Sequence, residues 1–160
     1  MKVIEKGIGY AAIGILYHKR TYNLGTLWRS AYILGASYIF TIGTKYKKQT
    51  SDVLKTWSRI PLFHYDDFED FKNNIPYDCS LIGVELTDQA IPLKDFQHPN
   101  RAIYLLGAED NGLPPKVLEQ CHELIQLPGD YSLNVAVTGS IVLNDRVQKL
   151  NCSLPKRKSS

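Results

Sequence analysis

Three short segments of this sequence combine residue types that could build a chemical site. Each places glycine or small polar residues beside an apolar run, and they cover residues 23–36, 105–113 and 131–143. Each also carries one polar side chain with chemical potential, namely Arg29, Glu109 and Asn134. Together they indicate a cofactor site built from loops, close to a basic side chain that could meet a nucleic acid.

Other positions follow predicted strands directly. Glu85 comes after Val84, and Gly107, Leu127 and Ser132 stand at or just past the ends of other apolar runs. In open α/β sheets ligands bind outside the carboxyl ends of strands, so we expect these positions to surround one pocket. The sequence has no Walker A lysine motif and no G-x-G-x-x-G between a strand and a helix. A nucleoside ligand would therefore depend on the backbone groups of loops.

Taken one at a time, these features have ordinary structural explanations. Gly107 and Gly112 suit a turn between a strand and a helix. Asn134 suits a helix N-cap, and Arg29 suits a helix surface where its stem covers apolar area. Only the order and combination of the segments favour a functional site over these explanations.

The elements that must position these residues alternate between short apolar runs and amphipathic stretches. Strands are expected over 11–17, 38–42, 62–65, 79–84, 102–106 and 124–127. Helices are expected from an Asn23 cap to Gly35 and over 51–58, 67–73, 114–121 and 134–150. This alternation predicts an α/β fold with a mostly parallel sheet and helices on both faces.

Length and composition limit the class of protein. The 160 residues and the 44% apolar content favour one folded domain over 1–150, followed by a short basic tail over 151–160. No apolar run reaches the roughly 18 residues that a membrane span needs, and residues 8–17 are expected to form a buried strand rather than a signal peptide. The isolated Cys79, Cys121 and Cys152 argue against a metal site or disulfide framework and favour a reducing, cytoplasmic setting.

The net charge of +3 is a weak guide to partners, but its distribution is uneven. Basic residues gather in two places, Lys45, Lys47, Lys48, Lys55 and Arg59 in one segment, and Lys156, Arg157 and Lys158 in the tail. Such clusters can bind phosphates through counterion release. A solvated surface and a frayed terminus explain them as well, and charge alone favours that second explanation.

The three segments resemble the signature motifs of the SpoU/TrmH branch of the SPOUT RNA methyltransferases. The first motif is Asn-x-Gly with an arginine four residues after the glycine, here Asn23, Gly25 and Arg29. The second is Gly-x-Glu-x-x-Gly-Leu, here residues 107–113, and the third is Ser-Leu-Asn-Val, here residues 132–135. The resemblance extends over residues 11–150, and all three motifs occur in the expected order.

The resemblance implies transfer of a methyl group from S-adenosylmethionine to a ribose 2′-hydroxyl of RNA, without a metal. It implies a trefoil knot near the carboxyl end, and a homodimer whose active site is assembled across the interface. The cofactor residues that carry over are Val84, Glu85, Gly107, Leu127, Ser132 and Leu133. The catalytic residue that carries over is Arg29, with Asn23, Glu109, Ser132 and Asn134 in support.

The role of Arg29 stays open between two possibilities. The family arginine is often described as a general base, but a guanidinium is neutral at pH 7 only at a cost of roughly 7.5 kcal/mol. A charged Arg29 that binds phosphate and stabilises the developing alkoxide avoids that cost. RNA binding would then involve the Lys19–Arg20 pair and the basic clusters on the domain surface.

Three alternatives remain at this level. The RNA is expected to be a tRNA, and a ribosomal RNA is the alternative. The chain could instead be an inactive RNA-binding or assembly protein that keeps the fold, although the presence of Arg29, Glu109 and Asn134 argues against it. A nucleotide-binding protein of flavodoxin type is weakened by the missing phosphate-binding motifs.

Overall fold

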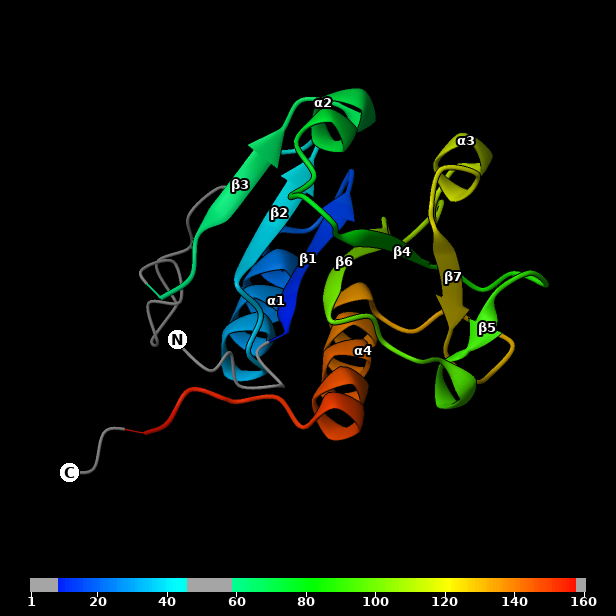
Figure 1. The fold of residues 1–160 in the computed structure, drawn as a ribbon. Coiled ribbons are helices and arrows are strands. Elements are labelled where there is room, and N and C mark those ends of the chain that lie inside the picture. Colours follow the sequence, from blue (N-terminus) through cyan, green and yellow to red (C-terminus); the bar gives the residue numbers. More distant parts are fainter. Residues whose placement is uncertain (1–8, 46–58, 158–160) are drawn as a thin grey trace.

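The structure is a computed structural model that describes residues 9–45 and 59–157 (Figure 1). The helix expected over 51–58 lies outside the described residues, as do Lys47, Lys48, Lys55 and Lys158 of the two basic clusters.

Parallel strands form one sheet in the order β3-β2-β1-β6-β4-β7-β5, with parallel pairing throughout the described part of the chain. The strands are β1 (Tyr10–Leu16), β2 (Tyr38–Ile42), β3 (Leu62–Tyr65), β4 (Ser80–Val84), β5 (Ile91–Pro92), β6 (Arg101–Gly107) and β7 (Glu123–Gln126). This confirms the parallel sheet that the alternating sequence pattern predicted. All the strands but β5 coincide with predicted ones to within two residues.

The central strands end close to one another. In the pairing of β1 with β6, Leu16 lies opposite Gly107. Val84 of β4 lies opposite Leu106 of β6 and Ile125 of β7. Because these strands run in the same direction, the loops that follow them leave from one edge of the sheet. The register therefore brings the chain segments after β1, β4, β6 and β7 together.

Helices cover both faces of the sheet, as predicted. The α-helices of the described residues are α1 (Thr21–Ile33), α2 (Phe68–Asn73), α3 (Pro115–Leu118) and α4 (Val135–Leu150). Figure 1 shows α1 and α4 on one side of the sheet and α2 and α3 on the other. Leu27 of α1 and Leu143 of α4 share a buried apolar cluster with Ile13, whereas Phe71 and Val117 belong to a second cluster on the opposite face.

The capping predictions for α4 and for the end of α1 are confirmed. Oδ1 of Asn134 accepts hydrogen bonds from the backbone amides of Ala136 at 2.9 Å and Val137 at 3.3 Å. Gly35 follows α1 with a φ of +81°, a left-handed conformation that favours glycine.

The predicted cap at Asn23 was wrong. The helix begins at Thr21, after Arg20, and Asn23 lies inside its first turn with 2% of its surface exposed. Its side chain makes tertiary hydrogen bonds with Glu109 and Asn134 rather than a local bond to the helix backbone. Sequence spacing cannot distinguish these two uses of an asparagine amide.

Two other boundaries differ from the prediction. Helix α3 ends at Leu118, three residues before Cys121, because the chain leaves it to join β7, and the His122 amide already donates to Leu81 of β4 at 2.8 Å. Strand β5 and the short 3₁₀-helix Leu93–Asp95 (η2) were not predicted. Two exposed strand residues are too few to give an alternating pattern.

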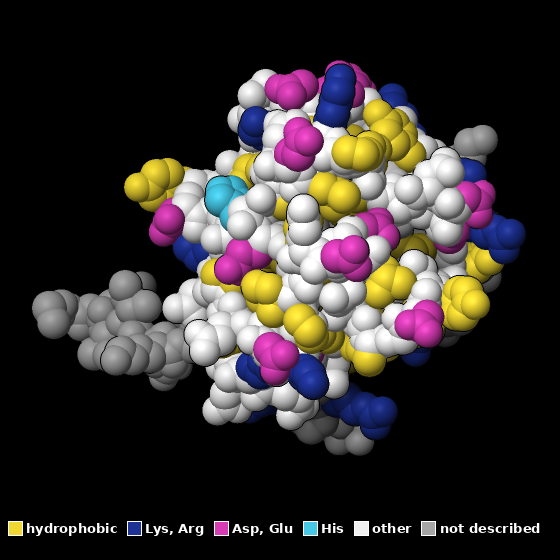
Figure 2. All heavy atoms as spheres, turned by 90° about the vertical axis from the view of Figure 1, so that its right-hand side faces the viewer, with side chains coloured by type: hydrophobic (Ala, Val, Ile, Leu, Met, Phe, Trp, Pro, Cys, Tyr) yellow, Lys and Arg dark blue, Asp and Glu magenta, His cyan; other side chains and the backbone are white. Residues whose placement is uncertain are grey.

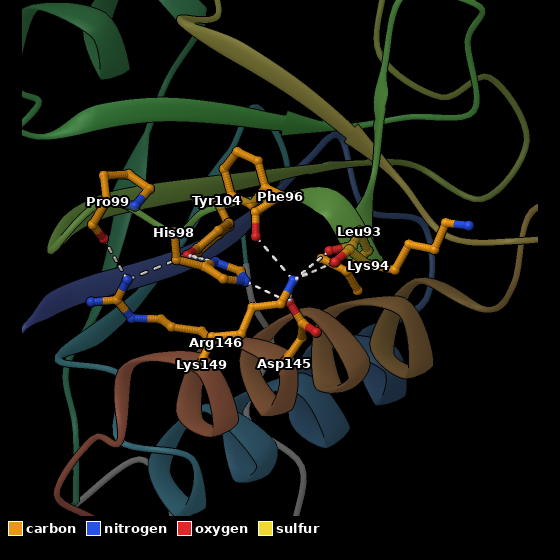
Figure 3. A network of polar contacts seen from close by, with 9 residues as sticks. All are labelled: Leu93, Lys94, Phe96, His98, Pro99, Tyr104, Asp145, Arg146 and Lys149. Carbon is orange, nitrogen blue, oxygen red and sulfur yellow. Dashed lines mark hydrogen bonds and ion pairs between the residues drawn. The ribbon is translucent and has the colours of Figure 1, made fainter.

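Helix α4 is fixed to the segment around residues 93–100 by polar groups (Figure 3). Arg146, only 3% exposed, donates to the carbonyls of Pro99 at 2.7 Å and Asn100 at 2.8 Å. Lys149 donates to the carbonyls of Leu93 at 2.6 Å and Phe96 at 2.9 Å. Arg146 is buried and Lys149 is exposed, and both cations tie α4 to this segment through its backbone carbonyls.

His98 connects the same helix to the sheet. Its Nδ1 lies 2.6 Å from the Tyr104 hydroxyl of β6, and its Nε2 lies 2.7 Å from the Asp145 carboxylate of α4. Burial lowers the pKa of His98 more than the hydrogen bond to Asp145 raises it. The imidazole is therefore neutral near pH 7 and acts as a structural bridge.

The described residues contain no helix that is both long and apolar enough to cross a membrane. Within the same ranges, no three or more His, Cys, Asp or Glu side chains are arranged to hold a metal ion. All three cysteines are free. Burial raises the pKa of the Cys121 thiol to about 11, and its Sγ lies 3.3 Å from the Val117 carbonyl, which fits a packing role.

Candidate active site

A cavity of about 310 Å³ lies at the carboxyl edge of the sheet. It is enclosed by the loops that follow β4, β6 and β7 and by the start of α4. The lining residues are Val84, Glu85, Leu86, Leu106, Gly107, Ala108, Glu109, Asp110, Asn111, Gly112, Gln126, Leu127, Tyr131, Ser132, Leu133, Val135 and Thr138. The second and third sequence segments thus meet around one hollow, as predicted.

Every position expected to contact a cofactor lines this cavity: Val84, Glu85, Gly107, Leu127, Ser132 and Leu133. Of the positions expected to support catalysis, Glu109 and Ser132 line it as well. Asn23 and Asn134 are outside the lining but connect to Glu109 through hydrogen bonds. Arg29 is the one expected site residue that the structure does not bring to this cavity.

The loop after β6 closes on itself. The Gly112 amide donates to the Ala108 carbonyl at 3.1 Å, and a Cβ on Gly107 would lie 2.4 Å from the backbone carbon of Gly112. Gly112 has a φ of +60°, and a Cβ there would lie 2.2 Å from Glu85 Oε2. Both glycines of the second motif are therefore required by the close approach of backbone and side chain.

Glu85 ties the loop after β4 to the loop after β6. Its Oε2 accepts a hydrogen bond from the Leu113 amide at 2.7 Å, and its own amide donates to the Ile125 carbonyl at 3.0 Å. The carboxylate therefore shapes the wall of the cavity and also presents negative charge to it.

A chain of three side chains links the three sequence segments. Asn134 Nδ2 donates to Asn23 Oδ1 at 3.0 Å, and Asn23 Nδ2 donates to Glu109 Oε1. Because Asn134 also caps α4, its amide is oriented by the helix before it reaches Asn23. The orientation of the Glu109 carboxylate at the cavity wall therefore depends on Asn23 directly and on Asn134 through Asn23.

Arg29 occupies a different place. It is exposed on α1, four residues before Ile33, which is 46% exposed, so both side chains belong to the same outer stripe of the helix. On α4, the exposed apolar side chains Val137 and Ile141 flank Ser140, whose hydroxyl donates to Ser30 Oγ of α1 at 2.7 Å. Arg29 thus borders an apolar surface formed by two adjacent helices.

The charge around the cavity is acidic. Three carboxylate side chains line it, Glu85, Glu109 and Asp110, and none of the described lysines or arginines does so. Lys19 forms a 2.5 Å ion pair with Asp110 from outside, and this hydrogen bond lowers the pKa of the Asp110 carboxyl. The face that carries β5 and β7 shows acidic and apolar side chains toward its middle and lysines and arginines mainly at its periphery (Figure 2).

The sequence did not single out several residues that the structure places at or behind the cavity wall. Gln126, Tyr131 and Thr138 line it. Tyr131 and Thr138 belong to the third segment without having been named as site residues, and for Gln126 the nearness to the end of β7 is the signal that could have indicated it. His18 lies behind the wall, 3% exposed, within electrostatic reach of Glu109. Its buried position follows from a local backbone turn that the sequence pattern does not predict.

A family model described as the SpoU rRNA Methylase family matches residues 15–144. A tRNA (guanosine(18)-2'-O)-methyltransferase of Saccharomyces cerevisiae is 26% identical over 132 residues, which are 76% of this chain and 9% of that protein. The chain covers only 5% and 9% of the length of the first two curated relatives it matches.

Among the solved structures that resemble this one, two illustrate the similarity. A structure that concerns 2-OH methylation of C/U34 on tRNA has a TM-score of 0.78 at 21% identity, and the match covers 91% of this chain and 99% of that one. The SpoU methyltransferase AviRb of Streptomyces viridochromogenes, in complex with AdoMet, has a TM-score of 0.79 at 17% identity, covering 93% of this chain and 62% of that one. These similarities establish the fold, and the family match, which spans all three sequence segments, establishes that this chain belongs to the SpoU rRNA Methylase family.

Proposed function

We propose that this chain transfers a methyl group from S-adenosylmethionine to a ribose 2′-hydroxyl of RNA, with a tRNA as its substrate. The observation that carries the proposal is the meeting of the second and third motif segments around one cavity, with Glu109 at its wall joined by hydrogen bonds to Asn23 of the first segment and, through Asn23, to Asn134. Relatives and structural neighbours named for RNA methylation support the same activity.

The charge and size of the cavity suit S-adenosylmethionine. A sulfonium and an ammonium group are cationic, and the lining offers three carboxylates and no described basic side chain. A phosphate-bearing nucleotide would be repelled by the same carboxylates, which argues against a flavodoxin-type ligand. The volume of about 310 Å³ lies near the lower end of the roughly 300 to 1,000 Å³ of small-molecule sites.

The residues that would hold the donor are the predicted ones. Backbone groups at Leu127 and at Ser132–Leu133 supply donors and acceptors for its nucleoside, while Glu85 and Gly107 shape the wall around it. When bound, the donor supplies the electrophilic methyl group. The task of the protein is then to align the ribose oxygen with that group and to exclude water.

We assign Arg29 a charged role. A guanidinium that stays protonated can bind an RNA phosphate and stabilise negative charge on the ribose oxygen, and it avoids the roughly 7.5 kcal/mol cost of deprotonation at pH 7. Its place on the outer face of α1 supports a role toward a site other than the cavity of its own chain.

A homodimer would give Arg29 such a site. Exposed Ile33, Val137 and Ile141 form an apolar surface on α1 and α4, and a surface of this kind on a soluble domain is typical of a protein interface. A two-fold contact through these helices would bring Arg29 of one protomer near the cavity of its partner. We also propose the carboxyl-terminal knot, because residues 131–133 and 135 line the same cavity as the loop after β6.

RNA contacts are proposed for the basic residues near the carboxyl edge. Lys19, Arg20 and Lys45 are exposed there, whereas the exposed Arg59 precedes β3 and lies over the Tyr32 ring at the opposite edge of the sheet. Arg20 donates to the Tyr22 hydroxyl at 2.9 Å, which holds its guanidinium at the surface. Phosphate contacts from such residues would give an affinity that falls steeply with salt.

Three measurements test the proposal. Isothermal titration with S-adenosylmethionine should show binding, and the purified protein should transfer a tritiated methyl group to RNA from a strain that lacks it. Mass spectrometry of tRNA and rRNA from that strain should reveal one missing ribose methyl in tRNA. A missing methyl group in rRNA would identify rRNA rather than tRNA as the substrate. If neither binding heat nor methylated RNA is detected, the proposal of an enzyme fails and an RNA-binding protein is the remaining candidate.

A further inference from the structure

Two of the three buried side-chain polar atoms that lack a hydrogen-bond partner within the described residues lie close to the proposed site. They are His18 Nδ1 and Glu109 Oε2. A buried polar group without a partner destabilises a fold, so native structures contain few of them and those few need an explanation. His18 Nδ1 can donate or accept a hydrogen bond, depending on the tautomer of the ring, whereas Glu109 Oε2 of an ionised carboxylate can only accept one.

The backbone turns sharply to bury His18. Tyr17, the residue after β1, has a φ of +52°, which is unfavourable for a residue with a Cβ, and its amide donates to the Ile42 carbonyl at 2.8 Å. Its ring packs where a Cβ on Gly43 would stand, 2.1 Å from ring carbon Cε1. A strained residue next to a functional site is commonly kept for the position it gives to its neighbour. Here that neighbour is the imidazole of His18.

The groups around His18 come from three elements. Two of these groups affect the pKa of His18, namely Glu109 in the loop after β6 and His64 on β3. His64 Nδ1 lies 2.8 Å from Thr41 Oγ1, and its Nε2 lies 3.7 Å from the Asp66 carboxylate. Lys19 follows His18 in the chain and is paired with Asp110, and Arg20 follows in turn. Burial lowers the pKa of His18 most, the Glu109 charge raises it and His64 lowers it, and the net direction is down.

We propose that His18 is a positioning residue for Glu109, an inference that rests on the proposed methyl transfer. A neutral imidazole leaves the carboxylate in its hydrogen bond to Asn23, with Oε2 buried beside the cavity wall. A protonated imidazole attracts Oε2 and draws the carboxylate away from Asn23, which breaks the link to Asn134. Methyl transfer therefore declines on the acid side as His18 takes up a proton.

The first test needs neither RNA nor a methyl donor. The sequence has four histidines, all of them in the described residues, so their ring signals can be followed by NMR across pH. We expect His18 to titrate below the ordinary value of about 6.5, and lower still in Glu109→Gln, because that variant removes the attracting charge. The titration of His98, which lies between Tyr104 and Asp145, should not move. A His18 titration that is the same in the wild type and in Glu109→Gln would overturn the proposal.

The second test uses the pH dependence of methyl transfer. His18→Asn keeps a polar group at the Nδ1 position but cannot take up a proton, so its rate of methyl transfer should fall less than that of the wild type as the pH is lowered below about 6.5. His122→Asn is the matched control, since its amide oxygen can still accept from the Leu81 amide, and its profile should follow the wild type.

The outcomes of the two tests separate the inference from the function on which it rests. An acid limb in His18→Asn that coincides with the wild type would overturn the role of His18. A wild type that transfers no methyl at any pH would overturn the proposed function, and the NMR titration would then decide alone whether His18 and Glu109 are coupled. If His18→Asn does not fold, the NMR titration of the wild type and Glu109→Gln remains the deciding test.

Discussion

The side-chain amide of Asn134 donates to Asn23 Oδ1 at 3.0 Å, although the two residues are 111 positions apart in the chain. One of them caps α4 and the other lies in the first turn of α1. This contact joins two helices on one face of the sheet. It also connects them to the carboxylate at the cavity wall, because the Asn23 amide donates a hydrogen bond to Glu109. Variants at this contact can separate the stability of the fold from the geometry of the site.

Asn134→Asp should impair methyl transfer by about tenfold or more, which corresponds to about 1.4 kcal/mol, with little loss of stability. The aspartate keeps the oxygen that caps α4 but lacks the amide hydrogen that Asn23 accepts. Asn134→Ala is the comparison, since it loses both functions and should also lower the free energy of unfolding by about 0.5–2 kcal/mol. Urea unfolding and initial rates measure the two effects, and equal rates in Asn134→Asp and the wild type would contradict the role of the contact.

Arg29→Ala should abolish methyl transfer while leaving the fold intact. The side chain is exposed, so the free energy of unfolding should change by less than about 0.5 kcal/mol. Binding of S-adenosylmethionine, measured by titration calorimetry, should also persist, because Arg29 does not line the cavity of its own chain.

Arg29→Lys serves as the control for charge. A lysine keeps the cation but lacks the planar donor fork, so partial activity supports an electrostatic role for the arginine. Normal turnover in Arg29→Ala would remove Arg29 from the mechanism.

Gly112→Ala should weaken binding of S-adenosylmethionine by about tenfold or more. An added Cβ would lie 2.2 Å from Glu85 Oε2, so the loop or the Glu85 carboxylate must move and the cavity wall must change. Gly129→Ala is the matched control: Gly129 also has a positive φ, of +109°, but an added Cβ there meets no atom within 4 Å. Titration calorimetry of both variants should therefore separate the effect of backbone strain from that of a displaced cavity wall. Equal affinities of the two variants for S-adenosylmethionine would contradict a specific role of the wall at Gly112.

Stability should fall as the pH is lowered through about 6.5. Burial holds the pKa values of His18 and His98 below that of a histidine in the unfolded chain, so the unfolded state binds more protons in this range and is favoured as the pH falls. The loss ends once the pH is below the folded pKa values. Urea unfolding between pH 8 and pH 5 measures it.

His98→Asn should reduce that pH dependence. The variant is less stable at pH 8, because His98 bridges Tyr104 and Asp145, but it loses one of the two titrating groups. A pH dependence as steep as that of the wild type would contradict the assignment of His98.

Ile141→Glu should dissociate the proposed homodimer. Ile141 is 38% exposed on α4, and a carboxylate there would have to lose its hydration in a dimer interface. Ile91→Glu is the control, since Ile91 is 37% exposed but lies on β5 at the far edge of the sheet. Analytical ultracentrifugation should show monomers for Ile141→Glu and dimers for Ile91→Glu, and identical behaviour of both variants would exclude this surface as the interface.

The sequence predicted the sheet well because its central strands are continuous apolar runs. Residues of β1, β2 and β6 are buried on both faces, and such runs are recognisable without knowledge of their neighbours. The cap at Asn134 and the glycine at Gly35 were also predictable, because both interact with the backbone close by in the chain.

The features that the sequence did not predict depend on distant partners. Asn23 was expected as a cap because nothing local indicates Glu109 and Asn134 as its partners. Arg146 is buried only because the carbonyls of Pro99 and Asn100 accept its hydrogen bonds, and charged residues are otherwise expected at the surface. The cavity positions were predictable because strand ends define them, whereas the place of Arg29 depends on the face of α1 that the packing leaves outside.

The order of strands in the sheet has a consequence for synthesis on the ribosome. Strand β1 pairs with β2, which follows soon after it, and with β6, which begins only at Arg101. A nascent chain that has emerged as far as residue 100 therefore holds β1 with one edge unpaired and with both of its apolar faces incompletely covered, since α4 on one face and α3 on the other are still missing. Unpaired edges of this kind invite association with other chains, so β1 stays open to such association until β6 has been inserted beside it.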